Sequence, residues 1–126
     1  MILGDLGAEV IKIERPRTGD DTREWGPPFI GSESAYFLSV NRNKKSITLD
    51  LDMPDGQKVL YSLVAKSDAL LENFTPGVTE KLQMDYQTIA NRNPRLIYCS
   101  ITSYGQTGPY RDWHGKRGIE HASWIQ

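Results

Sequence analysis

The chain has 126 residues, of which 38% are hydrophobic and 25% charged, and its formal net charge is −1. This composition is typical of one globular domain and excludes a disordered or fibrous chain. The near-neutral charge argues against a general binder of nucleic acids or membrane surfaces, which needs a basic excess. No apolar run is long enough to span a bilayer.

The single cysteine, Cys99, excludes an internal disulfide framework and suits a reducing compartment. The first residues, MILGDLGAEV, lack the basic start and long apolar core of a signal peptide, and they are not rich in Arg and Ser like a transit peptide. We therefore expect a soluble intracellular protein, mitochondrial or cytoplasmic. Both compartments stay open, because a targeting segment upstream of Met1 would leave no trace here.

The first half of the chain predicts a helix end, two strands and a short helix. Gly7 is suited to end the first helix in the left-handed conformation, and a strand at 10–13 follows directly. Residues 34–40 predict a helix with Ser32 as its cap, and residues 46–51 alternate as a second strand. Because a doubly wound fold rarely begins on the last turn of a helix, we expect a strand and most of a helix to be missing upstream.

The second half continues the alternation of helices and strands. Helices are expected at 55–66, 77–82 and 86–91, and strands at 69–71 and 96–101. The last strand, LIYCSI, is nearly all apolar, which is expected of a central parallel strand covered on both faces. The alternation predicts an α/β fold with a mainly parallel sheet, incomplete at both ends.

Three arginines, Arg15, Arg17 and Arg23, stand just after the first strand. Guanidinium groups bind phosphate in a bidentate way, and α/β proteins hold anionic ligands at the carboxyl ends of their strands. Alternatively, these arginines form ion pairs with the acidic residues of the same solvated loop. The sequence leaves both interpretations open.

Two further loops follow strands. The loop at 72–77, ENFTPG, combines an aromatic ring, Pro and Gly, and its exposed amides and ring are suited to line a pocket. The loop at 103–109 is rich in Gly but lacks the Gly-Lys-Ser/Thr of a phosphate loop. No GxGxxG motif follows any strand, so a nicotinamide site is not indicated. After residue 109 the pattern has no clear period.

Six segments resemble, in the same order, the class III CoA-transferases, the family of formyl-CoA transferase and carnitine CoA-transferase. They are LGDLGAEVIKIERP, GDDTREWGPP, ESAYFLSVNRNKKSITLDL, ENFTPGV, NPRLIYCSIT and YGQTGPY. NRNKKSI and GDDTREWGPPF are most similar to the branch that moves CoA between succinyl-CoA and dicarboxylic acids such as glutarate or hydroxymethylglutarate. The resemblance implies a Rossmann-like large domain, a small domain and a homodimer of interlinked chains. Residues 1–110 would form part of the CoA-binding domain, and residues 111–126 a truncated or divergent tail.

The resemblance implies that CoA is a substrate rather than a resident cofactor, and no metal is expected. It places CoA contacts at Arg15, Leu49, Asn73, Phe74 and Lys81. Two positions depart from the family pattern. Asp52 falls near the place of a Lys contact, and Ser103 stands where the family usually has Gly.

The reaction of such enzymes uses an Asp carboxylate that attacks the acyl-CoA thioester and forms a mixed anhydride and CoA thiolate. The thiolate returns to give an aspartyl-CoA thioester, and the acceptor acid reverses the sequence. Glu120 is the nearest equivalent here. Its extra methylene displaces the carboxylate, and about 1 Å of misplacement costs about a hundredfold in rate. We favour the interpretation that the sequence from Asp112 onward is divergent and has lost the nucleophile.

The sequence therefore predicts a fragment of a CoA-transferase that is inactive alone, with an acyl-CoA and a small carboxylic acid as partners. Neither nucleic acid nor a membrane is an expected partner. Two alternatives stay open. One is a family member that racemises 2-methylacyl-CoAs by acid–base chemistry. The other is a non-catalytic protein that binds CoA or modulates a dimer.

Overall fold

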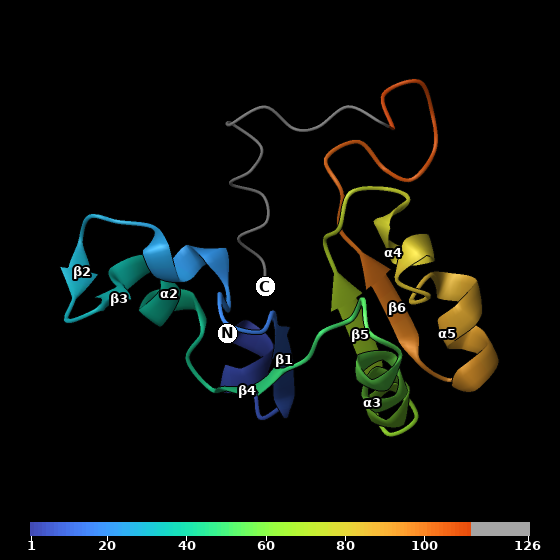
Figure 1. Cartoon of the computed structure of the whole chain (residues 1–126), viewed down its shortest axis with the longest axis horizontal. Helices are drawn as coiled ribbons and strands as arrows, with labels where there is room; N and C mark the ends of the chain where they lie inside the picture. The colour runs from blue at the N-terminus through green and yellow to red at the C-terminus, as the bar shows by residue number, and fades with distance from the viewer. Residues whose placement is uncertain (112–126) are drawn as a thin grey trace. The chain divides into compact units, whose positions relative to one another are not determined.

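The computed structural model describes residues 1–111, which belong to two compact units, Met1–Asp50 and the chain from Leu51 onward (Figure 1). Each unit contains one pair of parallel strands. The described residues thus form a mixed α/β fold with short parallel sheets. Among their helices, none has the length and apolar character needed to cross a membrane.

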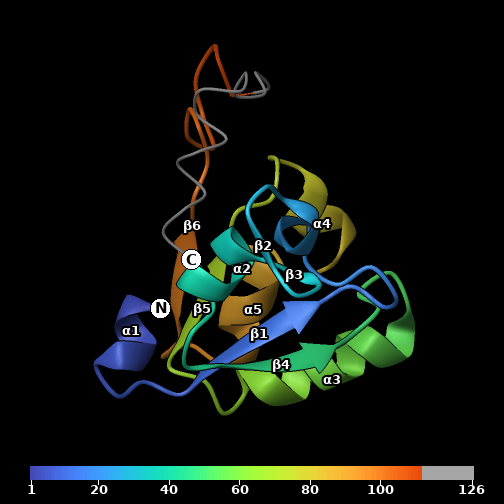
Figure 2. The ribbon, with the colours of Figure 1, turned by 90° about the vertical axis from the view of Figure 1, so that its left-hand side faces the viewer.

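The first unit is built on the parallel strands β1 (Val10–Glu14) and β4 (Lys44–Thr48), which Figure 2 shows side by side. Helix α1 (Ile2–Asp5) precedes β1. Gly7, which lies between them, has a φ of 97° and thus adopts the left-handed conformation after the helix, as predicted. The connection from β1 to β4 contains η1 (Asp21–Glu24), β2 (Phe29–Ile30), β3 (Glu33–Ser34) and α2 (Ala35–Val40).

Helix α2 forms where it is predicted, but its cap is Ser34 and not Ser32. The Ser34 Oγ accepts hydrogen bonds from the N–H groups of Tyr36 at 3.2 Å and Phe37 at 3.4 Å. The same hydroxyl donates to the carbonyl oxygen of Trp25. Because its hydroxyl accepts from the first N–H groups of the helix, Ser34 is the N-cap, and it is fully buried. Ser32 is exposed two residues upstream.

Strand β4 begins two residues earlier than the alternation at 46–51 predicts. Lys44 and Lys45, which precede the predicted range, pair with Val10 and Ile11 of β1. The strand ends at Thr48, and Leu51 lies in a turn. The length of a ladder depends on the partner strand, so the alternation of one segment alone does not locate its ends.

The second unit contains α3 (Pro54–Val64), β5 (Ala69–Glu72), α4 (Val78–Lys81), α5 (Tyr86–Arg92) and β6 (Ile97–Ser100), close to the predicted bounds. Strands β5 and β6 are parallel, with Ala69 opposite Ile97 and Glu72 opposite Ser100. Within residues 51–111, the buried apolar side chains are Leu60, Val64, Met84, Ile89 and Leu96. Burial of this set holds the helices on the sheet.

Within the described residues, β6 is not the doubly covered strand that LIYCSI suggests. Ile97 is 69% exposed, and Leu71 of the neighbouring β5 is 46% exposed. The other face is packed, since the Tyr98 hydroxyl donates to the Met84 carbonyl at 3.0 Å. An apolar run shows which side chains favour burial, but the surrounding elements decide which faces are covered.

Candidate functional site

Arg15 and Leu49 lie together at the carboxyl ends of β1 and β4. The Leu49 N–H donates to the Glu14 carbonyl at 3.0 Å, which places Leu49 beside the start of the Arg15 loop. That loop folds back at once, because Arg15 forms an isolated antiparallel bridge with Gly19. Arg15 is exposed, and its guanidinium pairs with none of residues 1–111. It is therefore open to an anionic ligand at this edge of the sheet.

Glu14, the last residue of β1, holds the loop in place. Its carboxylate is almost buried, with the residue 6% exposed, and accepts hydrogen bonds from the Asp20 N–H at 3.0 Å and the Ser46 hydroxyl at 2.9 Å. The Arg23 guanidinium pairs with it at 3.1 Å. Burial raises the pKa of Glu14, but the hydrogen bonds from Ser46 and Arg23 outweigh it, and the pKa lies below its ordinary value. The carboxylate therefore stays ionised.

Arg23 forms ion pairs, as the second interpretation of the arginine cluster predicts, but the prediction that its partners belong to the same loop is wrong. Besides Glu14, its guanidinium binds Glu33 at 3.2 Å and lies 3.9 Å from the centre of the Phe37 ring. Its partners come from β1 and β3 and not from its own loop. Arg23 therefore ties the loop to the sheet and is not available to a ligand.

A small cavity of about 210 Å³ lies beside Glu14 and Arg23 on the β1–β4 pair. It is lined by Lys12, Glu14, Arg23, Phe37, Asn41, Lys44, Lys45 and Ser46. Lys12 pairs with Asp20, and the Asn41 Oδ1 accepts from both Lys12 at 2.8 Å and Lys44 at 3.3 Å. Burial and the charge of Lys12 lower the pKa of Lys44. The cations here are largely compensated within the unit.

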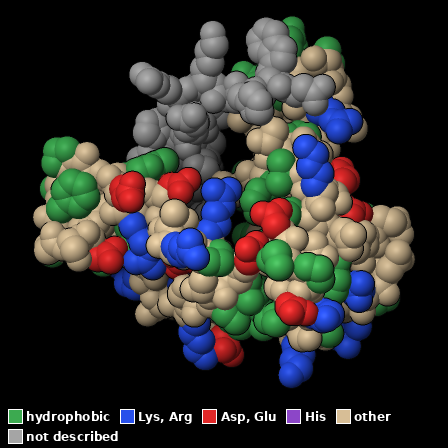
Figure 3. Space-filling view, viewed as in Figure 1, with side chains coloured by type: hydrophobic (Ala, Val, Ile, Leu, Met, Phe, Trp, Pro, Cys, Tyr) green, Lys and Arg blue, Asp and Glu red, His purple; other side chains and the backbone are tan. Residues whose placement is uncertain are grey.

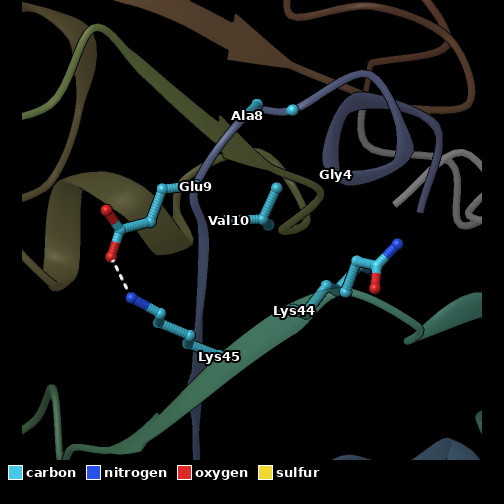
Figure 4. Close-up of a pocket in the computed structure, with 8 residues that line it drawn as sticks. Gly4, Ala8, Glu9, Val10, Lys44 and Lys45 are labelled. Carbon is cyan, nitrogen blue, oxygen red and sulfur yellow. Dashed lines mark hydrogen bonds and ion pairs between the residues drawn. The ribbon is translucent and has the colours of Figure 1, made fainter.

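A shallower hollow of about 480 Å³ lies at the amino ends of β1 and β4, and Figure 4 shows it with the Glu9–Lys45 ion pair across one side. The turn at 42–43 has a structural role beside it. Asp5 of α1 accepts hydrogen bonds from Arg42 at 2.6 Å and from Asn43 at 2.7 Å. Since ligands of open α/β sheets bind at the carboxyl ends of strands, we do not assign a site to this hollow.

Asn73 and Phe74 follow β5 directly in the second unit. Asn73 is exposed, and its side chain forms no hydrogen bond with residues 1–111, whereas Phe74 is half-buried. The Phe74 N–H donates to the Glu72 carboxylate at 2.8 Å. Lys81 ends α4, and its exposed ammonium also has no partner among the described residues. These polar side chains are open to a ligand.

Glu72 and Tyr98 lie on the same face of the β5–β6 pair in the second unit. Glu72 is 5% exposed, and no ion pair within residues 1–111 includes it. Burial raises the pKa of Tyr98 to about 12, and the nearby negative charge of Glu72 adds to the effect. The phenol is therefore neutral at physiological pH and can keep its hydrogen bond to Met84.

We expect Tyr98 to lose its proton at a higher pH than an unperturbed phenol does. Since its pKa in the folded chain is about 12 against 10.0 for an unperturbed phenol, the unfolded chain loses this proton first. The contribution to stability is complete below pH 10 and is lost as the pH rises toward 12. Ultraviolet titration of tyrosinate in the chain and in Tyr98→Phe measures it. Tyr98→Phe is expected to lack the titration step near pH 12. If it lacks a step near pH 10 instead, the assignment is contradicted.

The structure thus brings Arg15 beside Leu49 in one unit and Asn73 beside Phe74 in the other, with Lys81 at the end of α4. Glu120 lies outside the described residues, so its role stays a prediction. The sequence does not predict that Glu14 and Glu72 are buried carboxylates that bind the loops after their strands. A signal was present, because both IKIE and ALLE are strands that close on a carboxylate.

The face in Figure 3 carries basic and acidic side chains intermixed over the described residues, in line with a net charge of −1. Parallel strand pairs that alternate with helices define an α/β fold. The model of CoA-transferase family III matches residues 1–123, and the chain belongs to this family. The matched range includes Glu120.

Two curated relatives show which members of the family the chain is similar to. The chain is 58% identical over 122 residues to the succinyl-CoA:glutarate CoA-transferase of Homo sapiens, covering 97% of this chain and 28% of the relative. It is 48% identical over 120 residues to the succinate–glutarate CoA-transferase of Agrobacterium fabrum, covering 90% and 30%. The resemblance seen in the sequence is confirmed, and the chain spans less than a third of the length of these relatives.

The fold agrees with a solved structure. A CaiB/BaiF family protein from Brucella suis superposes with a TM-score of 0.87 at 46% identity, covering 96% of this chain and 33% of that chain. At this identity and coverage, the α/β arrangement described above is that of the family.

Proposed function

We propose that residues 1–110 are part of the CoA-binding domain of an enzyme that moves CoA between a small acyl-CoA, such as succinyl-CoA, and a carboxylic acid. One observation carries the proposal. Arg15, Asn73 and Lys81 are exposed and unpaired among the described residues, in a chain that is 58% identical to a succinyl-CoA:glutarate CoA-transferase. Arg15 and Asn73 stand at strand carboxyl ends, where α/β proteins bind ligands.

Each residue has a chemical role in this proposal. The Arg15 guanidinium binds a phosphate of CoA through two N–H donors, and the Lys81 ammonium adds a point charge. The Asn73 amide supplies a donor and an acceptor. Leu49 and Phe74 contribute apolar surface for the adenine or the pantetheine arm. CoA acts as a substrate, and the sheet belongs to a Rossmann-like domain of a homodimeric parent enzyme.

The acyl-transfer step requires a carboxylate nucleophile. If Glu120 has this role, its oxygen attacks the thioester carbonyl, the C–S bond breaks, and CoA leaves as the thiolate while a mixed anhydride forms. The thiolate then attacks the enzyme-derived carbonyl of the anhydride and releases the acyl group as a free carboxylate. The extra methylene of Glu relative to Asp argues against efficient alignment. We therefore favour a chain that binds CoA but transfers it slowly or not at all.

A transfer assay tests this directly. The chain is incubated with succinyl-CoA and glutarate, and glutaryl-CoA is measured by mass spectrometry. We expect little or no product, because the chain spans only 28% of the Homo sapiens relative. Turnover in the ordinary enzymic range of about 1–1,000 per second would contradict this. Saturable CoA binding without turnover is the result we expect, and it also agrees with the alternative of a non-catalytic CoA-binding protein.

Arg15→Ala is expected to weaken CoA binding by about tenfold, measured as Kd by isothermal titration calorimetry. A charge-assisted hydrogen bond contributes about 1.5–3 kcal/mol, and about 1.4 kcal/mol corresponds to tenfold in affinity. Arg95→Ala is the matched control, because it removes an exposed guanidinium near the amino end of β6. Equal losses in both variants would mean that only the overall charge matters, and Arg15 would not be a CoA contact.

A further inference from the structure

Glu72 has an arrangement that the roles above leave unexplained. It closes β5, is 5% exposed, and pairs with no cation among residues 1–111. Its carboxylate accepts the Phe74 N–H at 2.8 Å, and its backbone carbonyl accepts the Ile101 N–H at 2.9 Å. Burying a carboxylate is costly unless the hydrogen bonds it makes compensate. The backbone carbonyl already joins the strands, so the side chain is not needed for that.

The same arrangement occurs in the first unit. Glu14 closes β1, is 6% exposed, and its carboxylate accepts the Asp20 N–H at 3.0 Å. Its backbone carbonyl accepts the Leu49 N–H from the segment after β4 at 3.0 Å. In both units a buried glutamate ends the strand, and its carboxylate binds the backbone of the loop that follows. The next residue is in each case a proposed CoA contact, Arg15 or Asn73.

We propose that Glu72 is a positioning residue for CoA binding, which fixes the Asn73–Phe74 backbone through its carboxylate. This inference rests on the proposed function. The hydrogen bond to the Phe74 N–H closes a tight turn around Asn73, so the backbone of these two residues is ordered before a ligand arrives. A loop that is already ordered loses less conformational entropy on binding. Glu72 itself is buried and is not expected to touch CoA.

The charge of Glu72 is part of this role. A hydrogen bond to a carboxylate is about twice as strong as one to a neutral acceptor. The polar neighbour on the same face, Tyr98, gives its own hydroxyl proton to the Met84 carbonyl, which leaves the Glu72 carboxylate to accept from the loop. Gln at this position would keep an acceptor oxygen without the charge, whereas Ala would remove the acceptor. Comparison of the two variants therefore separates the contribution of the charge from that of the acceptor oxygen.

The test compares Glu72→Ala, Glu72→Gln and Asp55→Asn in the 126-residue chain. Asp55, on α3, is an exposed carboxylate that pairs among residues 1–111 with Lys58, so its variant removes the same charge far from the loop in sequence. Two quantities are measured: the hydrogen-exchange rate of the Phe74 amide by NMR, with the Ile101 amide as internal reference, and the Kd for CoA by calorimetry.

We expect Glu72→Ala to raise both the exchange rate of the Phe74 amide and the Kd by about tenfold, and Glu72→Gln to raise both by about threefold. Asp55→Asn and the Ile101 amide are expected to stay within about twofold. An unchanged Phe74 exchange rate, or equal effects of Gln and Ala, would overturn the proposal. If Glu72→Ala does not fold, Glu72→Gln alone decides by the same Phe74 rate.

The failure of the proposed function looks different. If the unmodified chain binds no CoA while Phe74 exchange still increases from Glu to Gln to Ala, the CoA-binding proposal fails, and Glu72 fixes the loop for another purpose. If CoA binds equally to all variants while Phe74 exchange changes, the loop does not contribute to CoA affinity, and the positioning proposal is wrong.

Discussion

Ile89→Ala is expected to lower the free energy of unfolding of the second unit by about 3–4 kcal/mol. Ile89 lies on α5, which contacts α3, and is 0% exposed. Truncating a buried Ile removes its transfer free energy and leaves a cavity that the surrounding residues fill only in part. The unit is small, so a loss of this size is a large share of its stability.

The measurement is native-state hydrogen exchange of the β5–β6 amides, which reports the unfolding of this unit by itself. Ile97→Ala is the control, because Ile97 is an isoleucine of the same unit that is 69% exposed. We expect the control to change the free energy of unfolding by no more than about 0.5–1 kcal/mol. A similar loss from both substitutions would show that the burial of Ile89 is not what stabilises the unit.

Arg23→Ala is expected to lower the free energy of unfolding of the first unit by about 3 kcal/mol. The substitution leaves the Glu14 carboxylate buried without its cation, and removing one partner of a buried pair costs about 3–5 kcal/mol. The lower end applies because the Arg23 side chain is 33% exposed. The ion pair with Glu33 and the contact with the Phe37 ring are lost as well.

Exchange of the Leu49 amide, which donates to the Glu14 carbonyl, measures this loss. Arg17→Ala is the control in the same loop, since Arg17 is exposed and pairs with none of the described residues. Adding Glu14→Gln to Arg23→Ala removes the uncompensated charge, so the double variant is expected to regain about 1–2 kcal/mol. If neutralising Glu14 restores nothing, the cost of Arg23→Ala does not come from the buried charge.

The Glu14–Arg23 ion pair and the Glu72–Phe74 hydrogen bond connect the stability of each unit to the proposed CoA contacts. Arg15 directly follows Glu14, and the Phe74 N–H donates to the Glu72 carboxylate. Arg15 and Asn73 each follow directly on a buried carboxylate that ends a strand. A variant that disturbs either carboxylate is expected to affect ligand affinity through the loop, even though the carboxylate is shielded from the ligand.

Several features were determined by the sequence alone. The strands at 10–13, 69–71 and 96–101 and the helix at 55–66 were found close to their observed bounds, since local apolar periodicity follows from the geometry of each element. Gly7 was recognised as a helix end because few residues other than Gly adopt its backbone conformation. The family was recognisable from the order of six short segments, because linear motifs survive in the sequence without any knowledge of contacts.

Other features were decided only by the tertiary structure. Arg23 pairs with Glu14 and Glu33 because the loop folds back over the sheet, and no local pattern shows which distant carboxylates it meets. The start of β4 depends on its pairing with β1, and the exposure of Ile97 depends on which elements cover β6. Registry, burial and charge pairing are properties of segments brought together in space. They depend on chain folding, whereas periodicity and turn preference belong to each segment by itself.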